Sequence, residues 1–171
     1  ARGFVYVAGR AGEGFPTTPQ TVQPAFAGDA ERNGAYGKQD GFITKLSPDG
    51  SKIVWSTYFG TPGPAIIRDM DLDAQGNIYV VMIELSRPSP HVTPGAFQTR
   101  QPGGMDSLVA KISPDARKVI WCTYLGGSGR DLAPSLRVGA DGQPVVAGST
   151  FSTDFPVTPG AFHRQLPGKQ D

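Results

Sequence analysis

The sequence predicts an all-β protein made of repeated units of four antiparallel strands. Glycine and proline are abundant, with 23 and 16 of the 171 residues, and they separate short runs rich in Val, Ile, Phe, Tyr and Trp. This texture is typical of many short strands joined by turns. No stretch has the sustained i, i+3, i+4, i+7 apolar spacing of a long helix. In addition, a segment recurs along the chain, and self-similarity at a fixed period indicates a repeat fold.

The repeat is clearest between segments 40–60 and 106–126. Ten of the 21 aligned residues are identical, and most of the others exchange one apolar residue for another. The second copy follows the first at an offset of 66 residues, as the pair Asp40 and Asp106 shows. Two further pairs of segments align downstream: 73–80 with 139–146, and 93–97 with 158–162.

A partial third copy opens the chain. Gly3–Gly9 matches the strand that contains Tyr79, and Pro24–Phe26 is expected to match the Pro-Gly-Ala-Phe turn of the linkers. Lys169–Asp171 repeats Lys38–Asp40. We therefore divide one domain into a partial repeat, a full repeat, and a second full repeat with the start of the next: 1–39, 40–105 and 106–171.

Each full repeat is predicted to hold four strands. They are expected at 42–46, 53–59, 67–72 and 78–83, and again at 108–112, 119–125, 135–138 and 145–148. The Ser-Pro-Asp-Gly sequence ending at Gly50 is a tight-turn sequence. Because Ala116 replaces this glycine in the second copy, we expect a different turn type there. The second strand carries large apolar groups on both faces, which suits a sheet sandwiched between two others.

A four-stranded unit repeated at this period has the size of a somewhat long β-propeller blade. The chain is then expected to hold about two and a half to three blades, which form an incomplete propeller. Sandwich and solenoid folds stay open as alternatives. They explain less well why each repeat has one set of four strands followed by one linker.

Several motifs recur in the same order in consecutive copies. They are Asp-x-Phe-Ile-x-Lys-Leu-Ser-Pro-Asp-Gly at 40–50, Trp-Ser-Thr-Tyr-Phe-Gly at 55–60, Gly-Asn-Ile-Tyr-Val at 76–80, and Ser-Thr-Asp-Phe-Pro-Val-Thr-Pro-Gly-Ala-Phe at 152–162. Together they resemble the bacterial SBBP-type β-propeller repeats. The resemblance departs at Arg87–His91, where the linker loses its Asp-Phe-Pro, and at the acidic insert Asp29–Arg32. It implies large secreted or cell-surface bacterial proteins but no single activity, and it supplies no catalytic residues.

Charge and apolar patterning argue against some partners. The chain has 16 Lys and Arg against 15 Asp and Glu, scattered without a basic run, so no nucleic-acid partner is expected. No apolar run approaches the ~18 residues that span a bilayer. The single cysteine, Cys122, stands where the other repeat has Ser56, and we expect a small buried residue rather than a reactive thiol. A start at Ala1 without Met leads us to expect a processed or excised product.

Three alternating aspartates, Asp69, Asp71 and Asp73, form the most suggestive acidic pattern. Alternating carboxylates can face one side of a strand, as calcium ligands do. The second copy has Arg137 and Gly139 at two of the three positions, and the distal Glu of an EF-hand is missing. We therefore favour a solvated strand edge and turn over a metal site.

Other polar residues recur with the repeat itself. Asp40, Asp106 and Asp171 open each hairpin, either as a ring of carboxylates around a channel or, as we favour, as caps of the turn after the linker. Lys45 and Lys111 could line an anion-attracting channel, but we favour rim charges with buried stems.

The histidines, tryptophans and one glycine-rich run complete the candidates. His91 and His163 lie in linkers without metal-ligand or catalytic-triad spacing, so both are expected to be solvent-exposed. Trp55 and Trp121 could stack on sugars, but their mid-strand position favours the core. The glycines of 126–129 form a turn and not a phosphate loop, because no Lys-Ser/Thr follows.

These features predict no catalytic residue, metal ligand or cofactor. A propeller closes with about four to eight blades, so the blades expected here would be completed by blades of a longer chain, by identical subunits in a ring, or by head-to-tail subunits in a filament. The leading expectation is a non-enzymatic extracellular or cell-surface scaffold for protein interaction, adhesion or filament assembly, with a surface glycan or protein as its ligand. The alternative is part of a carbohydrate-active propeller enzyme, a lyase or glycosidase, whose catalytic residues lie mostly outside this chain.

Overall fold

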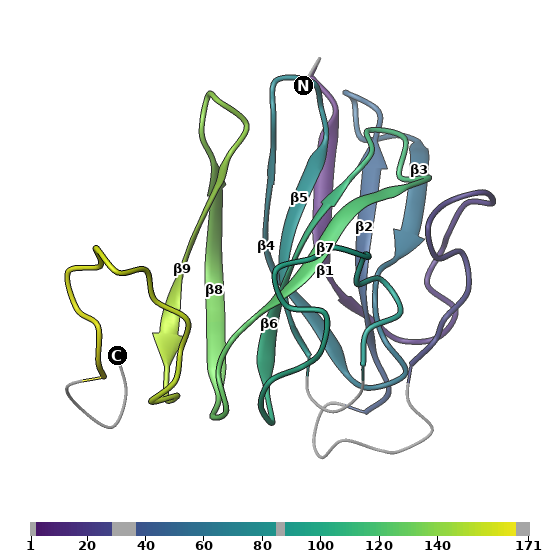
Figure 1. Ribbon diagram of the computed structural model, residues 1–171. Helices are drawn as coiled ribbons and strands as arrows, with labels where there is room; N and C mark the ends of the chain where they lie inside the picture. The colour runs from purple at the N-terminus through teal and green to yellow at the C-terminus, as the bar shows by residue number, and fades with distance from the viewer. Residues whose placement is uncertain (1–2, 29–36, 85–87, 167–171) are drawn as a thin grey trace.

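The computed structural model describes residues 3–28, 37–84 and 88–166, and over these residues the chain is all β (Figure 1). Nine strands form three antiparallel sheets, and the part of the chain described contains no helix. The prediction of an all-β protein is confirmed. No helix long and apolar enough to cross a membrane is found in the same residues.

The strands follow one another along the chain as three meanders. We call them the first, central and third sheets. The first sheet contains β1 (Val5–Ala11), β2 (Asp40–Leu46) and β3 (Ile53–Tyr58); the central sheet contains β4 (Ala65–Leu72), β5 (Ile78–Glu84), β6 (Asp106–Ile112) and β7 (Val119–Leu125); the third sheet contains β8 (Asp131–Val138) and β9 (Pro144–Thr150).

The four-stranded sheet does not coincide with one sequence repeat. All eight strands predicted in the two full repeats are found, but β2 and β3 pair with β1, whereas β4 and β5 pair with β6 and β7. The short connection 59–64 crosses to the next sheet, while the long linker 85–105 returns to the same sheet, where Glu84 pairs with Asp106. The sheet therefore joins the second half of one repeat to the first half of the next.

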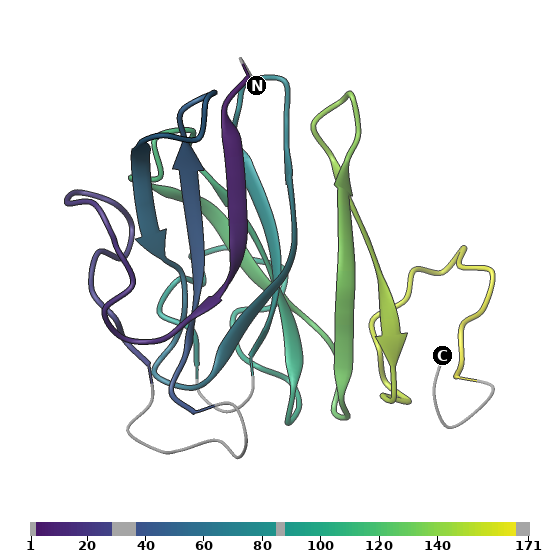
Figure 2. The same cartoon turned by 180° about the vertical axis from the view of Figure 1, so that it is seen from behind.

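The central sheet is buried on both faces. All seven residues of β5 are buried, and residues 78–82 alternate between two apolar clusters. Ile78 and Met82 pack with Phe59 of the 59–64 connection, whereas Tyr79 packs with Leu136 of the third sheet. Figures 1 and 2 show the sheets following one another across the molecule, with β4 against β1 on one side and β8 on the other.

The first linker joins β1 to β2, and its residues 12–28 cover the outer edge of β3. The backbone N–H of Thr18 donates to the carbonyl of Ser56 at 2.8 Å, and the N–H of Tyr58 donates to the carbonyl of Gln23 at 3.0 Å. These bonds satisfy backbone groups that an open sheet edge would leave free to pair with another chain.

The second linker covers β7 in the same way. Thr93 N–H donates to the carbonyl of Cys122 at 3.1 Å, and Tyr124 N–H donates to that of Gln98 at 3.1 Å. The equivalent of 93–98 is therefore 18–23, and the predicted match between Pro24–Phe26 and the Pro-Gly-Ala-Phe turn is wrong. The sequence does not reveal the turn of the first linker, because Gln, Thr and Val at 20–22 replace the Gly, Ala and Phe at 95–97.

The hairpin turns of the two copies share one conformation, so the expectation of different turn types is wrong. Gly50 has φ 71° and Ala116 has φ 55°, and each N–H donates at 2.9 Å to the carbonyl three residues earlier. A non-glycine residue in this left-handed region is strained. Neighbouring contacts hold Ala116 there, because it is fully buried and its carbonyl accepts the N–H of Val22 at 2.8 Å.

Replacing Gln20 by glycine is expected to raise the free energy of unfolding by about 1 kcal/mol. Gln20 is exposed and has φ 65°, whereas the second linker has Gly95 with φ 78° at this position. Glycine removes the left-handed strain without losing a buried contact. Urea unfolding checks this. The control is Gln75→Gly, which should be neutral or destabilising, because Gln75 is an exposed turn residue without a positive φ.

Candidate functional site

The repeated aspartates fasten the linkers to the sheets. Asp40 begins β2 and Asp106 begins β6, and both are fully buried. Oδ2 of Asp40 accepts the N–H of Ala27 at 2.8 Å, and Oδ2 of Asp106 accepts that of Gly103 at 2.9 Å. These contacts agree with the interpretation as caps at the end of the linker. Asp171 lies outside the described residues.

Glu84 adds a second buried carboxyl next to Asp106. The two residues are cross-strand partners, and Oε2 of Glu84 accepts the hydroxyl of Tyr124 at 2.8 Å. Burial raises the pKa of Glu84 to about 7, and burial together with the nearby Asp131 raises the pKa of Asp106 to about 6. The sequence analysis missed Glu84, although a carboxyl at the end of an apolar strand was a usable signal.

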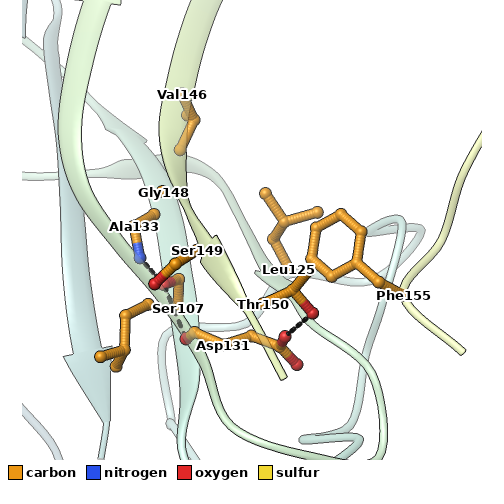
Figure 3. A pocket seen from close by; sticks show the side chains of 10 residues that line it. Ser107, Leu125, Asp131, Ala133, Val146, Gly148, Ser149, Thr150 and Phe155 are labelled. Atoms are coloured by element: carbon orange, nitrogen blue, oxygen red, sulfur yellow. Dashed lines mark hydrogen bonds between the residues drawn. The ribbon is translucent and has the colours of Figure 1, made fainter. Parts of the chain in front are cut away.

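Asp131 joins the β7–β8 loop to the third linker, residues 151–166, and to the end of β9, where Figure 3 shows its contact with Thr150. Its carboxylate accepts the hydroxyl of Thr150, the N–H of Gly127 at 2.6 Å and the hydroxyl of Ser152 at 2.7 Å. Sequence reasoning missed this residue as well, because Ala65 occupies the equivalent position in the preceding repeat. The predicted glycine turn at 126–129 is part of this network.

A cavity of about 210 Å³ lies between the central and third sheets. At the equivalent place between the first and central sheets, Phe59, Ile67 and Met82 are buried. Smaller residues at the corresponding positions leave the cavity open. Its lining comprises Ser107, Leu125, Asp131, Leu132, Ala133, Val146, Gly148, Ser149, Thr150 and Phe155 (Figure 3).

Two of the three alternating aspartates connect β4 to β8. Oδ2 of Asp69 accepts the N–H of Leu136 at 2.9 Å and pairs with Arg137 at 2.8 Å. Oδ2 of Asp71 accepts the N–H of Val138 at 2.8 Å. The predicted solvated strand edge is therefore wrong at these two positions, because a neighbouring strand supplies donors that the sequence does not reveal.

Asp73 lies in the β4–β5 turn, as predicted, but it is buried and not solvated. It accepts the N–H of Asn77 at 2.8 Å and forms an ion pair with Lys111 at 3.1 Å. Burial by itself would raise the pKa of Asp73. The hydrogen bonds from Asn77 and Lys111, of which the one from the Asn77 side chain contributes most, hold this pKa below its usual value. Within 3–28, 37–84 and 88–166, no group of three or more His, Cys, Asp or Glu residues is placed to hold a metal ion.

Replacing Asp71 by asparagine is expected to lower the free energy of unfolding by about 1–2 kcal/mol. The carboxylate receives a backbone N–H across two sheets, and charged acceptors form the stronger hydrogen bonds. Chemical denaturation would measure the loss. The matched control is Asp141→Asn, since Asp141 is exposed and accepts the N–H of Gln143 within its own turn. Equal effects of both substitutions would contradict a role between sheets.

The repeated lysines lie against aromatic rings. The ammonium of Lys111 sits 4.9 Å from the ring centre of Tyr79, and that of Lys45 sits 4.3 Å from that of Phe4. Both side chains are half-buried. This geometry agrees with charges whose stems pack on the sheets.

His91 is not solvent-exposed, contrary to the prediction. Its ring stacks on Phe59 with 4.2 Å between centres, and its Nε2 lies 3.0 Å from Oε1 of Gln23. Burial lowers its pKa to about 4, so the neutral ring donates to Gln23 at neutral pH. The second linker folds back against the first linker and the 59–64 connection, which its sequence does not indicate. His163 is exposed beside Phe162, as predicted.

The tryptophans and the cysteine belong to the packed interior, as predicted. Trp55 is buried and donates its indole N–H to the carbonyl of Pro114 at 3.1 Å. Trp121 packs partly buried against Tyr79. Cys122 is fully buried, and burial raises its pKa to about 12, which keeps the thiol protonated.

Comparison with known proteins assigns the chain to no family. No protein-family model matches it, and no curated protein matches it.

Proposed function

We propose that the three sheets are successive blades of a β-propeller and that the chain is a non-enzymatic scaffold. The observation that carries this proposal is the central sheet, a four-stranded antiparallel meander buried on both faces between a three-stranded and a two-stranded antiparallel sheet. A blade in a propeller has this environment, because each blade covers its faces with its neighbours.

The position of β4 and β8 supports the same arrangement. Each is the first strand of its sheet, and the two lie side by side, joined through Asp69 and Asp71. In a propeller the first strand of every blade lies nearest the central axis. The remaining blades come from a longer chain or from identical subunits.

The non-enzymatic role is supported by how the polar side chains are used. Asp40 and Asp106 fasten linkers, while Glu84 and Asp106 are fully buried. A glycosidase needs two carboxyl groups that reach the sugar on either side of the scissile bond. The buried pair cannot reach a glycan, so it lends no support to the carbohydrate-active alternative.

Location and partner follow from the resemblance to SBBP-type repeats. The motifs at 40–50 and 55–60 favour a bacterial extracellular or cell-surface protein. We therefore propose that the assembled propeller presents its loops to a surface protein or glycan, in adhesion or filament assembly.

Turnover assays on the protein from its natural source test the non-enzymatic role. Chromogenic glycosides and bacterial polysaccharides would be incubated with the protein, and products measured by reducing-end and unsaturated-sugar absorbance. We expect no turnover above buffer. Turnover above buffer that co-purifies with the folded protein would overturn the proposal.

A further inference from the structure

We propose that the third linker, residues 151–166, and the free edge of β9 form a docking surface for a β-hairpin of the repeat's own type, delivered by another repeat. The inference rests on the proposed propeller architecture and names the partner that this surface fits. β9 pairs only with β8 among the described strands. The first two linkers each hold such a hairpin, so their contacts define the occupant.

The first anchor is a threonine that precedes proline in every linker. Thr18 and Thr93 are half-buried, and each exchanges hydrogen bonds with the outer strand of its hairpin, at Ser56 and Cys122. The equivalent Thr158 is exposed. Its turn is nevertheless formed, since Ala161 N–H donates to the Thr158 carbonyl at 3.1 Å.

The second anchor lies five residues later. The N–H of Gln23 and that of Gln98 each donate at 3.0 Å to a threonine hydroxyl of the outer strand, Thr57 or Thr123. The carbonyls of the same two glutamines accept the N–H of the next strand residue, a tyrosine. His163 occupies this place in the third linker and is exposed. Its backbone can offer the same donor and acceptor to a strand.

The third linker also forms a solvent-open pocket of about 460 Å³ with the end of β9. In the first linker, Phe15 lies 4.3 Å from the ring centre of Phe42 and 6.1 Å from that of Tyr58. Phe155 corresponds to Phe15, so the pocket fits an apolar residue and a tyrosine of a hairpin. Its lining comprises Thr150, Ser152, Thr153, Phe155, Val157, His163, Arg164, Gln165 and Leu166.

Apolar exposure at equivalent positions identifies the same surface. Val92 packs against the core in the second linker, whereas Val157, at the same place before the threonine, is 48% exposed. An exposed apolar residue beside a free strand edge is typical of a site for strand addition.

The surface is held in place without its occupant. Ser152 donates its hydroxyl to Asp131 at 2.7 Å and accepts the N–H of Gly129 at 2.8 Å. Asp154 accepts the N–H of Ser128 at 2.8 Å. These bonds fix the start of the linker to the β7–β8 loop, so little ordering remains when a hairpin binds.

A synthetic peptide of residues 40–60 tests the proposal with the full chain. The hairpin is used in linear and head-to-tail cyclised forms, because an isolated hairpin is marginally stable in water. Calorimetry is expected to give saturable one-to-one binding, and NMR to place the shifted amides in β9 and 151–166. Thr158→Val should weaken binding about fivefold, as loss of one hydrogen bond predicts.

Matched variants separate this site from others. Thr93→Val changes the same anchor in an occupied linker and should leave the peptide affinity unchanged. A peptide with Tyr58→Ala should lose roughly tenfold or more in affinity, because its ring fills the pocket. The docking surface would be overturned by absence of binding by both peptide forms or by amide shifts confined to β1. Equal effects of Thr158→Val and Thr93→Val on the peptide affinity would also overturn it. If the protein binds the hairpin peptide but forms no ring, the propeller architecture is rejected and the docking surface is supported.

Discussion

Replacing Phe59 by alanine is expected to lower the free energy of unfolding by about 3–5 kcal/mol. The ring is fully buried, belongs to the cluster between the first and central sheets, and stacks on His91. Its removal loses the transfer free energy of the ring and leaves a cavity in a packed interface. Because domains of this kind have only about 5–15 kcal/mol of stability, the loss is a large fraction of the whole.

Denaturant unfolding of Phe59→Ala and Phe162→Ala measures this effect against a matched control. Phe162 is 96% exposed, so its substitution should change the stability by less than about 0.5 kcal/mol. Similar values for the two variants would show that the first and central sheets do not bury Phe59 in solution.

The buried carboxyls of Glu84 and Asp106 are expected to make the protein less stable as the pH rises from about 4 to about 8. The pKa of Glu84 is about 7 in the folded chain against 4.5 in a model peptide, and that of Asp106 is about 6 against 3.8. In this window the unfolded chain releases protons that the folded chain still holds, so the folded state is the one destabilised by raising the pH. The loss levels off above about pH 8. For Glu84 alone it amounts to about 3 kcal/mol. His91 acts in the opposite direction, because folding lowers its pKa from 6.5 to about 4, so its contribution to stability rises with pH between these values.

Glu84→Gln removes the ionisable group and keeps an acceptor for the Tyr124 hydroxyl. The variant should be more stable than the parent chain at about pH 8 and should lose less stability between about pH 5 and 8. Unfolding at several pH values across this range provides the measurement. The exposed Glu13→Gln serves as control, with a profile parallel to that of the parent chain. Equal slopes for Glu84→Gln and the parent would refute the raised pKa.

The sequence was sufficient for the strands because their signals are local. Alternating apolar residues and the Ser-Pro-Asp turns placed β2, β3, β6 and β7 within a few residues. Which strands share a sheet could not be predicted from the same signals. A repeat has no intrinsic starting point, and the long linker 85–105 looked more like a boundary than the short connection 59–64 that crosses between sheets.

The candidate site was harder to predict because its contacts are distant in the sequence. Asp69 and Asp71 meet donors 67 residues later, on β8. His91 meets Gln23 across 68 residues. Asp40 and Asp106 were interpreted correctly as caps, because their role is set by the linker directly before them.

Electron microscopy with native mass spectrometry of the protein from its natural source tests the central proposal most directly. If the three sheets are blades, the particles should be closed rings of about four to eight radial sheets, formed by one long chain or by several copies. The central sheet should then fit the density of one radial sheet. A compact particle in which the three sheets complete a closed two-layer sandwich, with no radial arrangement, would contradict the proposal.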